Sequence, residues 1–436
     1  MVYGIDLGTT YSLIGSGDKL YSDLVASAVN LETKEQVDLN NITPSVIHSY
    51  KTDMTTGEMG ELPISCSSIV LKKLAHIASK RTGEEVKDVV ISGPAKFTTT
   101  QREATWRAAL KAGLNPRGLI NEPTAAAIYA CREYKDLIVV YDLGGGTFDV
   151  TILDSRTGQY YVVATDGHAK LAGDNLDEAI AKYIMGQCKT PIMLRSELNM
   201  LKLKSACRVA KENITQYADE QFIEVPEMNI QFTLTKEKYI ELMKDTFRPT
   251  LDLTQEVIGS SLMEFDRPKL LFVGGSTADK YLREWIKDEL GLEEFKIDCN
   301  PSFIVARGIA LYAQMVENGS AEVEINDVTD RLSIEMSTGM TETIIEKNTT
   351  IPTSETYLIS NNEDTRYINL NLYQGDEVMA SQNSYIGTLV YDYGKVMPKG
   401  TGVVDVEVRI DRNGQVTLLA TDFTRNETQE IKLVLR

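Results

Sequence analysis

Two segments about 135 residues apart carry the residue types that hold phosphate groups and a metal ion. They are residues 5–10, IDLGTT, and residues 141–147, YDLGGGT. In each, an apolar run ends on aspartate, turns through glycine and presents threonine, which is the pattern of a strand entering a tight hairpin. The N–H groups of a glycine turn can bind an anion, and an adjacent aspartate can hold a hydrated divalent cation.

The repetition of this pattern predicts two similar lobes that close on one polyphosphate–metal complex. The alternative is two unrelated hairpins that both contain glycine. We prefer the first interpretation because aspartate, glycine and threonine recur at matching places in the two segments.

The segments around these hairpins predict an α/β domain that places them. Residues 1–316 alternate strand-like and helix-like patterns. Thr98 and Gln101 have the spacing of a capping box, which predicts a helix that ends at Gly113. A helix should also start at residues 121–123, NEP, and a strand at 137–141 should lead into the second hairpin. Residues 270–277, LLFVGGST, predict a third glycine turn, between a strand and a helix, which suits an anion or ribose contact.

The pattern changes to period two in the last quarter of the chain. Residues 317–328 are mostly polar and predict a linker, and residues 329–436 predict an antiparallel β-sandwich without a helical lid. Alternating apolar residues at 368–372 and 404–410 and a hairpin turn at Asn413-Gly414 support this interpretation.

Composition excludes several classes of protein. The net charge of −18 and the pI of about 4.8 argue against nucleic acid or an anionic membrane surface as a main partner. The five cysteines are scattered, without the spacing of a zinc site, and the three histidines lack the spacing of ligands or a catalytic triad. No signal peptide or long apolar span is evident, so we expect a cytoplasmic protein.

These motifs together resemble those of the heat shock protein 70 (DnaK-type) chaperone family. The resemblance extends over nearly the whole chain. It rests on GIDLGTTYS at 4–12, INEPTAAA at 120–127, YDLGGGTFDV at 141–150, LFVGGST at 271–277, NTTIPT at 348–353 and YQGD at 373–376. It implies a two-lobed ATPase domain of the actin-like, ribonuclease H-like α/β fold, followed by an all-β antiparallel sandwich.

The resemblance implies a role for each residue that matches a family motif. ATP or ADP and Mg²⁺ would be the cofactors, with Asp6 and Asp142 holding the water shell of the metal ion. The residues implied to bind nucleotide are Gly8, Thr9, Thr10, Tyr11, Gly144, Gly145, Gly146, Thr147, Gly173, Lys211, Thr215, Gly274, Gly275 and Ser276. The candidates for catalysis are Glu122, Asp142, Thr147 and Asp149; phosphoryl transfer depends mainly on such positioning and charge neutralisation.

The resemblance also implies communication with a peptide site. Pro94 and Arg102 match the family's interdomain switch, although alone they could be a strand terminator and a solvated helix residue. Ile334, Met336, Ile368 and Leu370 align with the peptide groove; the alternative is that the isoleucines and Leu370 are sandwich core. The partners implied are unfolded or extended apolar peptides and, as further candidates, J-domain and nucleotide-exchange co-chaperones.

Some segments depart from the family pattern. The segment 43–73 is much shorter than in typical members, so the stretch that carries the catalytic lysine is expected to be deleted. Lys51 could substitute for this lysine, but no motif supports it. The linker lacks the usual leucines, which predicts weak coupling between the domains. At the adenine side Arg208, Glu212, Ala278 and Ser302 differ from the family, and at the peptide arch Ser337 and Asn362 do so.

Three functions remain open from the sequence. The first is a lidless chaperone with a slow ATPase. The second is a nucleotide-regulated interaction module, a pseudo-ATPase that binds nucleotide with little or no hydrolysis. The third and weakest is a small-molecule kinase of the same fold, because the sandwich has no place in such an enzyme.

Overall fold

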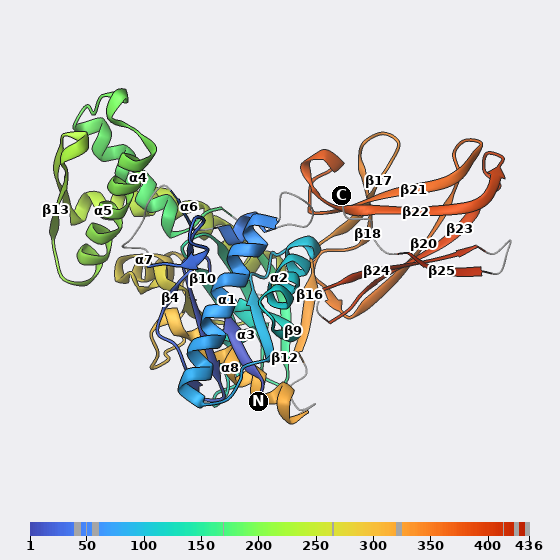
Figure 1. Cartoon of the computed structure of the whole chain (residues 1–436), viewed down its shortest axis with the longest axis horizontal. Coiled ribbons are helices and arrows are strands. Elements are labelled where there is room, and N and C mark those ends of the chain that lie inside the picture. Colours follow the sequence, from blue (N-terminus) through green and yellow to red (C-terminus); the bar gives the residue numbers. More distant parts are fainter. Residues whose placement is uncertain are drawn as a thin grey trace.

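The chain forms a two-lobed α/β body that continues into a β-sandwich (Figure 1). The computed structural model describes residues 1–38, 45–48, 50–54, 61–168, 170–263, 266–319, 325–412, 414–422 and 427–431. Parts of the predicted linker and Asn413 of the predicted hairpin turn therefore lie outside the described residues.

The first lobe is built on a sheet whose strands run in the order β3-β2-β1-β8-β9, with β4 beside β2. These strands are β1 (Tyr3–Asp6), β2 (Tyr11–Ser16), β3 (Lys19–Leu20), β4 (Val25–Ala26), β8 (Asp88–Gly93) and β9 (Asn115–Asn121). A small sheet of β5 (Ala28–Asn30), β6 (Glu35–Gln36) and β7 (Val46–His48) adjoins them. Helices α1 (Glu61–Thr82) and α2 (Thr99–Lys111) pack on the main sheet through a shared apolar core.

The sheet of the second lobe repeats the plan of the first. Its strands are β10 (Leu137–Leu143), β11 (Phe148–Asp154), β12 (Tyr160–His168) and β15 (Lys269–Val273). The β10–β11 hairpin is antiparallel, as is β1–β2, and β15 runs parallel to β10 as β8 does to β1. This shared topology agrees with the prediction of two similar lobes.

Two helices pack together between the sheets and join the lobes. They are α3 (Glu122–Ala130) and α8 (Pro301–Asn318), and they share a buried core with β8, β10 and β15. Gly308 allows their close approach, since a Cβ there would clash with the carbonyl of Ala125. Because α3 begins at Glu122, this packing fixes a candidate catalytic residue at the boundary between the lobes.

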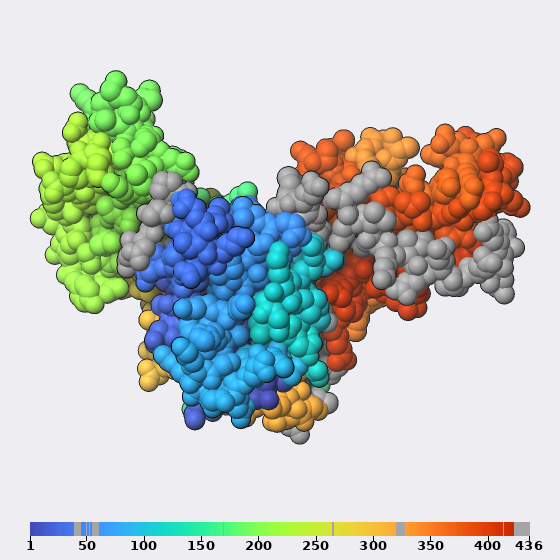
Figure 2. Space-filling model, viewed as in Figure 1, coloured from blue at the N-terminus to red at the C-terminus, as the bar shows by residue number. Residues whose placement is uncertain are grey.

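A further group of elements extends from the second lobe and forms the green part of Figure 1. It contains α4 (Gly173–Gln187), α5 (Glu197–Gln216), β13 (Glu220–Val225), β14 (Ile230–Thr235) and α6 (Lys236–Ser261). Helix α7 (Lys280–Leu290) packs beside α6. In the space-filling view this part and the sandwich project from different sides of the central body (Figure 2).

The sandwich consists of two four-stranded antiparallel sheets. One contains β17 (Leu332–Glu335), β18 (Thr341–Ile345), β21 (Thr365–Gln374) and β22 (Ser384–Met397). The other contains β20 (Thr353–Ser360), β23 (Val403–Ile410), β24 (Val416–Asp422) and β25 (Glu427–Ile431). Their inward apolar side chains form one separate core, because alternate residues of each strand face the opposite sheet.

The predicted linker differs from the structure at both ends. Helix α8 continues to Asn318, and residues 325–329 form strand β16 (Ile325–Thr329), which pairs in parallel with β12. Strand β19 (Thr349–Ile351) then pairs with β16, so the second-lobe sheet extends into the chain of the sandwich. The absence of leucines predicts weak coupling between the domains through the linker. The linker strand β16 nevertheless joins the second-lobe sheet, because strand pairing depends on main-chain groups and needs no leucine.

Other local predictions can be compared directly. Thr98 and Gln101 form the predicted capping box, and Lys72 and Lys73 lie exposed on α1.

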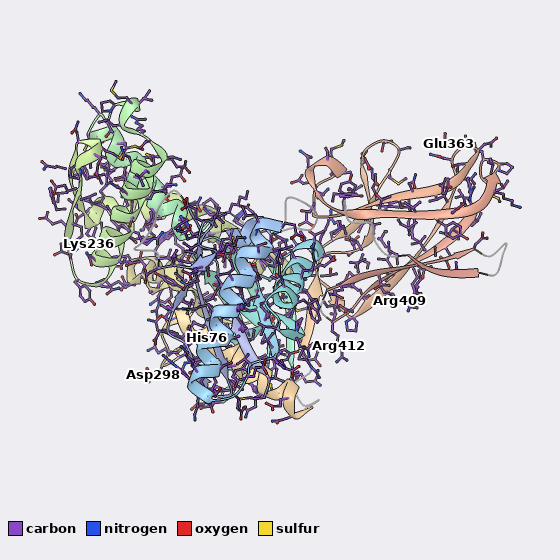
Figure 3. All side chains as sticks on the ribbon, viewed as in Figure 1. His76, Lys236, Asp298, Glu363, Arg409 and Arg412 are labelled. Carbon is purple, nitrogen blue, oxygen red and sulfur yellow. The ribbon has the colours of Figure 1, made fainter. Side chains whose placement is uncertain are left out.

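Charged side chains such as Asp298, Glu363 and Arg409 point away from the core (Figure 3). Among the described residues, no helix has the length and apolar character needed to cross a membrane.

Candidate functional site

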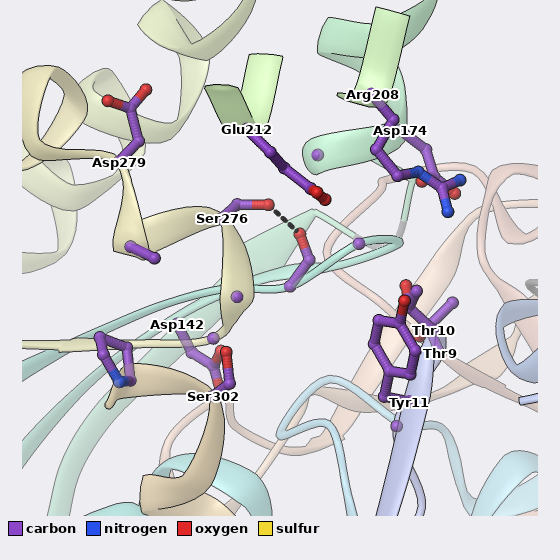
Figure 4. A pocket seen from close by; sticks show the side chains of 18 of the residues that line it. Thr9, Thr10, Tyr11, Asp142, Asp174, Arg208, Glu212, Ser276, Asp279 and Ser302 are labelled. Atoms are coloured by element: carbon purple, nitrogen blue, oxygen red, sulfur yellow. Dashed lines mark hydrogen bonds between the residues drawn. The ribbon is translucent and has the colours of Figure 1, made fainter. Parts of the chain in front are cut away.

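A cavity of about 470 Å³ lies where the two hairpins and the elements of the second lobe meet. All of the predicted nucleotide and metal residues line it except Gly146, whose neighbour Gly145 does (Figure 4). Of the predicted catalytic residues, Glu122, Asp142 and Thr147 line it too. Asp149 does not line the cavity but lies directly opposite Asp142 in the antiparallel β10–β11 hairpin. The structure therefore brings together residues from positions 6 to 276.

The two glycine–threonine hairpins face each other across this cavity. A Cβ at Gly145 would clash with Thr10 Oγ1, and one at Gly146 would clash with the side chain of Thr9. Thr10 Oγ1 is buried and has no hydrogen-bond partner among the described residues. Buried hydroxyls are usually satisfied, so this one is available to a ligand that enters between the hairpins.

The second hairpin is held by the glycine turn that follows β15. Ser276 Oγ donates to the carbonyl of Gly144 at 2.7 Å, and the N–H of Gly173 donates to the same oxygen at 3.1 Å. Lys211 Nζ reaches the carbonyl of Gly173 at 3.2 Å. These bonds join the second phosphate hairpin to α4, α5 and the third glycine turn.

Four carboxylates gather at one end of the cavity, which we call its closed end: Asp6, Glu122 and Asp142 line the cavity there, and Asp149 lies opposite Asp142 in the β10–β11 hairpin. Asp142 and Asp149 are 7% and 2% exposed, and Asp6 is half-buried. Burial, together with the charge of Glu122, raises the pKa of Asp6 and of Asp149 to about 7 and raises the pKa of Asp142 as well. So much buried negative charge is costly unless a cation is near.

Lys51 supplies one such cation, in the place that a substitute for the expected catalytic lysine would take. Its Nζ donates to Glu122 Oε1 at 2.5 Å, and its side chain is 3% exposed. It lies on the 3₁₀ helix Tyr50–Asp53, and Nζ is 5.4 Å from the centre of the Phe97 ring. No motif marks Lys51, but between residues 21 and 60 the sequence holds only one other lysine, Lys34, and no arginine.

The residues at the closed end fit a hydrated Mg²⁺. In the described part of the chain, no group of three or more His, Cys, Asp or Glu side chains could hold a metal ion by itself. Mg²⁺, however, keeps several water ligands and commonly uses one or two carboxylates together with phosphate oxygens. Asp6 and Asp142 provide two carboxylates. The charge of Asp6 is one of the causes that raise the pKa of Asp142, and a cation bound between them would relieve this repulsion.

The other end of the cavity is lined by polar residues of α5, α8 and the third glycine turn. Lys211 is paired with Asp177 at 2.7 Å, whereas Glu212 points into the cavity near Ser276 (Figure 4). Ala278 and Ser302 line the facing side. All four positions at which the adenine side departs from the family thus line the cavity, and in the view of Figure 4 Arg208 lies above Tyr11.

Of the two predicted switch residues, Arg102 contacts the sandwich. Pro94 is buried directly after β8. Arg102 donates to Asn121 Oδ1 at 2.5 Å and to the carbonyl of Phe97 at 3.4 Å. A Cβ at Gly414 of the sandwich would lie 3.1 Å from Arg102 Cδ, so the two domains touch at this arginine.

The predicted peptide residues divide into two groups. Ile334 and Ile368 are 3% and 7% exposed within the sandwich core, which is the alternative that the sequence left open. Leu370 is half-buried against the same core, and Met336 is 42% exposed. Met336 is therefore the most exposed of the four predicted peptide residues.

A comparison with protein-family models bears on residues 33–435, which is most of the chain. The model described as Hsp70 protein matches residues 33–435 of the 436 residues. This match includes the second hairpin, the third glycine turn and the sandwich. Members of that family are chaperones that bind ATP or ADP with Mg²⁺. Since the match extends over far more than half of its length, the chain belongs to the Hsp70 family.

Proposed function

We propose that this protein binds Mg-ATP or Mg-ADP between its lobes and hydrolyses ATP slowly. One observation carries the proposal: Thr10 and Gly145 meet across a cavity that is lined at its closed end by Asp6, Glu122 and Asp142, with Lys51 bound to Glu122. The hairpin N–H groups and the free hydroxyl of Thr10 would bind the phosphates. Asp6 and Asp142 would hold the water shell of Mg²⁺, which supplies charge neutralisation to the phosphates when bound.

The remaining groups at the closed end suit the hydrolytic step. Glu122 and Asp149 can orient an attacking water molecule and accept its proton, since the pKa of Asp149 is raised to about 7. Lys51, held by Glu122, places a positive charge beside them. Such preorganised charge typically contributes more to phosphoryl transfer than any covalent role of the protein.

The test is calorimetric titration with ATP and ADP, with and without Mg²⁺, together with a phosphate-release assay. We expect affinity that depends on Mg²⁺ and a slow release of phosphate. Asp142→Asn should weaken the Mg²⁺-dependent part of the affinity. Equal affinity with and without Mg²⁺ would contradict the roles of Asp6 and Asp142, and tight binding without release would favour the pseudo-ATPase.

We also propose that the sandwich binds extended apolar peptides. Three methionines gather at one end of it: Met336, Met340 and Met379, which are 42%, 45% and 40% exposed. Main-chain bonds connect their loops, since Met336 N donates to the carbonyl of Met340 and residue 340 forms a bridge with residue 379. Flexible methionine side chains suit varied apolar partners. The test is fluorescence anisotropy of a short labelled apolar peptide; unchanged binding after Met336→Ser and Met379→Ser would place the site elsewhere.

A further inference from the structure

A cluster of five charged side chains lies where the second lobe meets the sandwich. Lys96 Nζ lies 3.2 Å from Asp166 Oδ1 and 3.3 Å from Asp330 Oδ2. Lys347 Nζ lies 2.5 Å from Asp166 Oδ2 and 2.7 Å from Asp376 Oδ2. Lys96 and Asp166 belong to the lobes, whereas the other three follow the linker strand, so each lysine pairs across the domain boundary.

This cluster is more than a set of solvated ion pairs. The side chains of Lys96, Asp166 and Asp330 are 18–19% exposed. Burial alone would raise the pKa of Asp166, but the two lysines beside it hold that pKa below its usual value. Partly buried charges that share partners are screened less by salt than exposed pairs and are more strongly held in place.

The main chain of Lys96 reaches the closed end of the nucleotide cavity. Its N–H donates to Asp149 Oδ1 at 3.4 Å. The same short segment continues into α2, where the N–H of Thr99 donates to Gln374 Oε1 of the sandwich at 3.1 Å. One residue therefore contacts a candidate catalytic carboxylate through its backbone and the sandwich through its side chain.

We propose that Lys96 is a positioning residue for Asp149 and that Asp330 of the sandwich holds it in place. The inference rests on the proposed ATPase function and deepens it. When Asp330 and Asp166 fix the ammonium group, the backbone of residues 95–97 keeps its N–H directed at Asp149. When the sandwich moves away, Lys96 loses Asp330, and the donor to Asp149 becomes mobile.

Amide exchange tests this link without any nucleotide. Hydrogen–deuterium exchange of the segment 95–97 is measured by mass spectrometry in the full chain and in Asp330→Asn. We expect at least threefold faster exchange in the variant. Asp392→Asn is the matched control, because Asp392 pairs with Arg366 on the sandwich surface at 2.8 Å and is not part of the cluster. Exchange in Asp330→Asn that equals the control would overturn the proposal.

Steady-state kinetics test whether the link reaches the chemistry. Lys96→Met and Asp330→Asn should each lower kcat threefold or more and leave KM within twofold. Lys96→Arg, which can still pair with both aspartates, should retain kcat within twofold of the parent. The double variant Lys96→Met/Asp330→Asn should be no slower than Lys96→Met alone, because both changes break one link.

The two experiments separate failure of the inference from failure of the proposed function. Multiplicative losses in the double variant, or an Asp330→Asn variant with the kcat of the parent, would overturn the link. If the parent released no phosphate at all, the ATPase proposal would fail, and the exchange of residues 95–97 would still decide whether Asp330 holds Lys96.

Discussion

Lys51 is the residue on which hydrolysis should depend most. We expect Lys51→Met to lower the rate of phosphate release about 10²–10³-fold, the scale of losing one preorganised charged donor, while nucleotide affinity changes only a few-fold. Lys72→Met is the matched control, since Lys72 is exposed on α1. Single-turnover phosphate release and calorimetry measure the two quantities. Hydrolysis that survived Lys51→Met unchanged would remove Lys51 from the catalytic group.

The acid cluster should make stability depend on pH. Because the pKa of Asp149 is raised to about 7 in the folded chain, the folded state holds a proton that the unfolded state has lost, and stability falls as pH rises from about 4 to 7. Asp149→Asn should therefore stabilise the nucleotide-free protein at pH 8 by on the order of 2 kcal/mol, and by less at pH 5. Thermal unfolding at both pH values checks this. An equal gain at the two pH values would contradict the assignment.

Gly145 gives a steric test of the facing hairpins. Gly145→Ala should weaken nucleotide binding and lower thermal stability, because a Cβ there meets Thr10 Oγ1. The double variant Gly145→Ala/Thr10→Ala should recover part of the lost thermal stability, because it removes that hydroxyl. Gly186→Ala is the control, since nothing lies within 4 Å of a Cβ at that helical position, and it should be neutral or stabilising by up to about 1 kcal/mol. Unimpaired nucleotide binding in Gly145→Ala would show that the hairpins separate on binding.

The sequence identifies functional residues best where the residues that act together are neighbours in the chain. The two hairpins are recognisable because aspartate, glycine and threonine follow one another within a few residues. Lys51 could not be found in this way, because its partner Glu122 lies 71 residues later and only folding brings them together. The burial of Ile334 and Ile368 was equally undecided, since alternation gives the same pattern for a core and for a groove.

Elements were predictable where their signals lie within one segment. The capping box before α2 and the helix that begins at Glu122 are such cases. Strand β16 is different, because its partners β12 and β19 lie on either side of it in the sheet and far from one another in sequence. A polar segment with only a few apolar residues becomes a strand there because two neighbouring strands offer main-chain partners.

The central place of β16 leads to a prediction at the scale of the element. Asn326 is paired with Tyr161, and its strand lies between two others. Asn326→Pro should therefore separate the sandwich from the lobes, because proline cannot donate to the sheet and is not tolerated in a central strand. Asn326→Ala keeps the N–H and is the control. An increase in the radius of gyration measured by small-angle scattering should appear in the proline variant only; equal values for both variants would mean that β16 does not hold the domains together.

At the scale of the whole molecule, two apolar cores meet at the linker strand. Val328 packs into the core that joins the two lobes, whereas the core of the sandwich begins at Leu332. Between them, Lys96 and Asp166 pair with the sandwich residues Asp330 and Lys347. The domains thus keep separate cores and are joined by a strand and by charges, an arrangement that can open without unfolding either domain.

The missing leucines predict weak coupling, but the pairing of β16 leads us to expect stronger coupling. If nucleotide binding changes the lobes and the sandwich docks on them through β16 and Lys347, peptide affinity must depend on which nucleotide is bound, because the two equilibria are linked. We expect at least a tenfold difference in peptide affinity between the ATP and ADP forms, about 1.4 kcal/mol of coupling. Peptide anisotropy in each nucleotide measures it, and Asn326→Pro should reduce the difference to less than twofold. A parent protein with equal affinities would show that docking of the sandwich is independent of nucleotide.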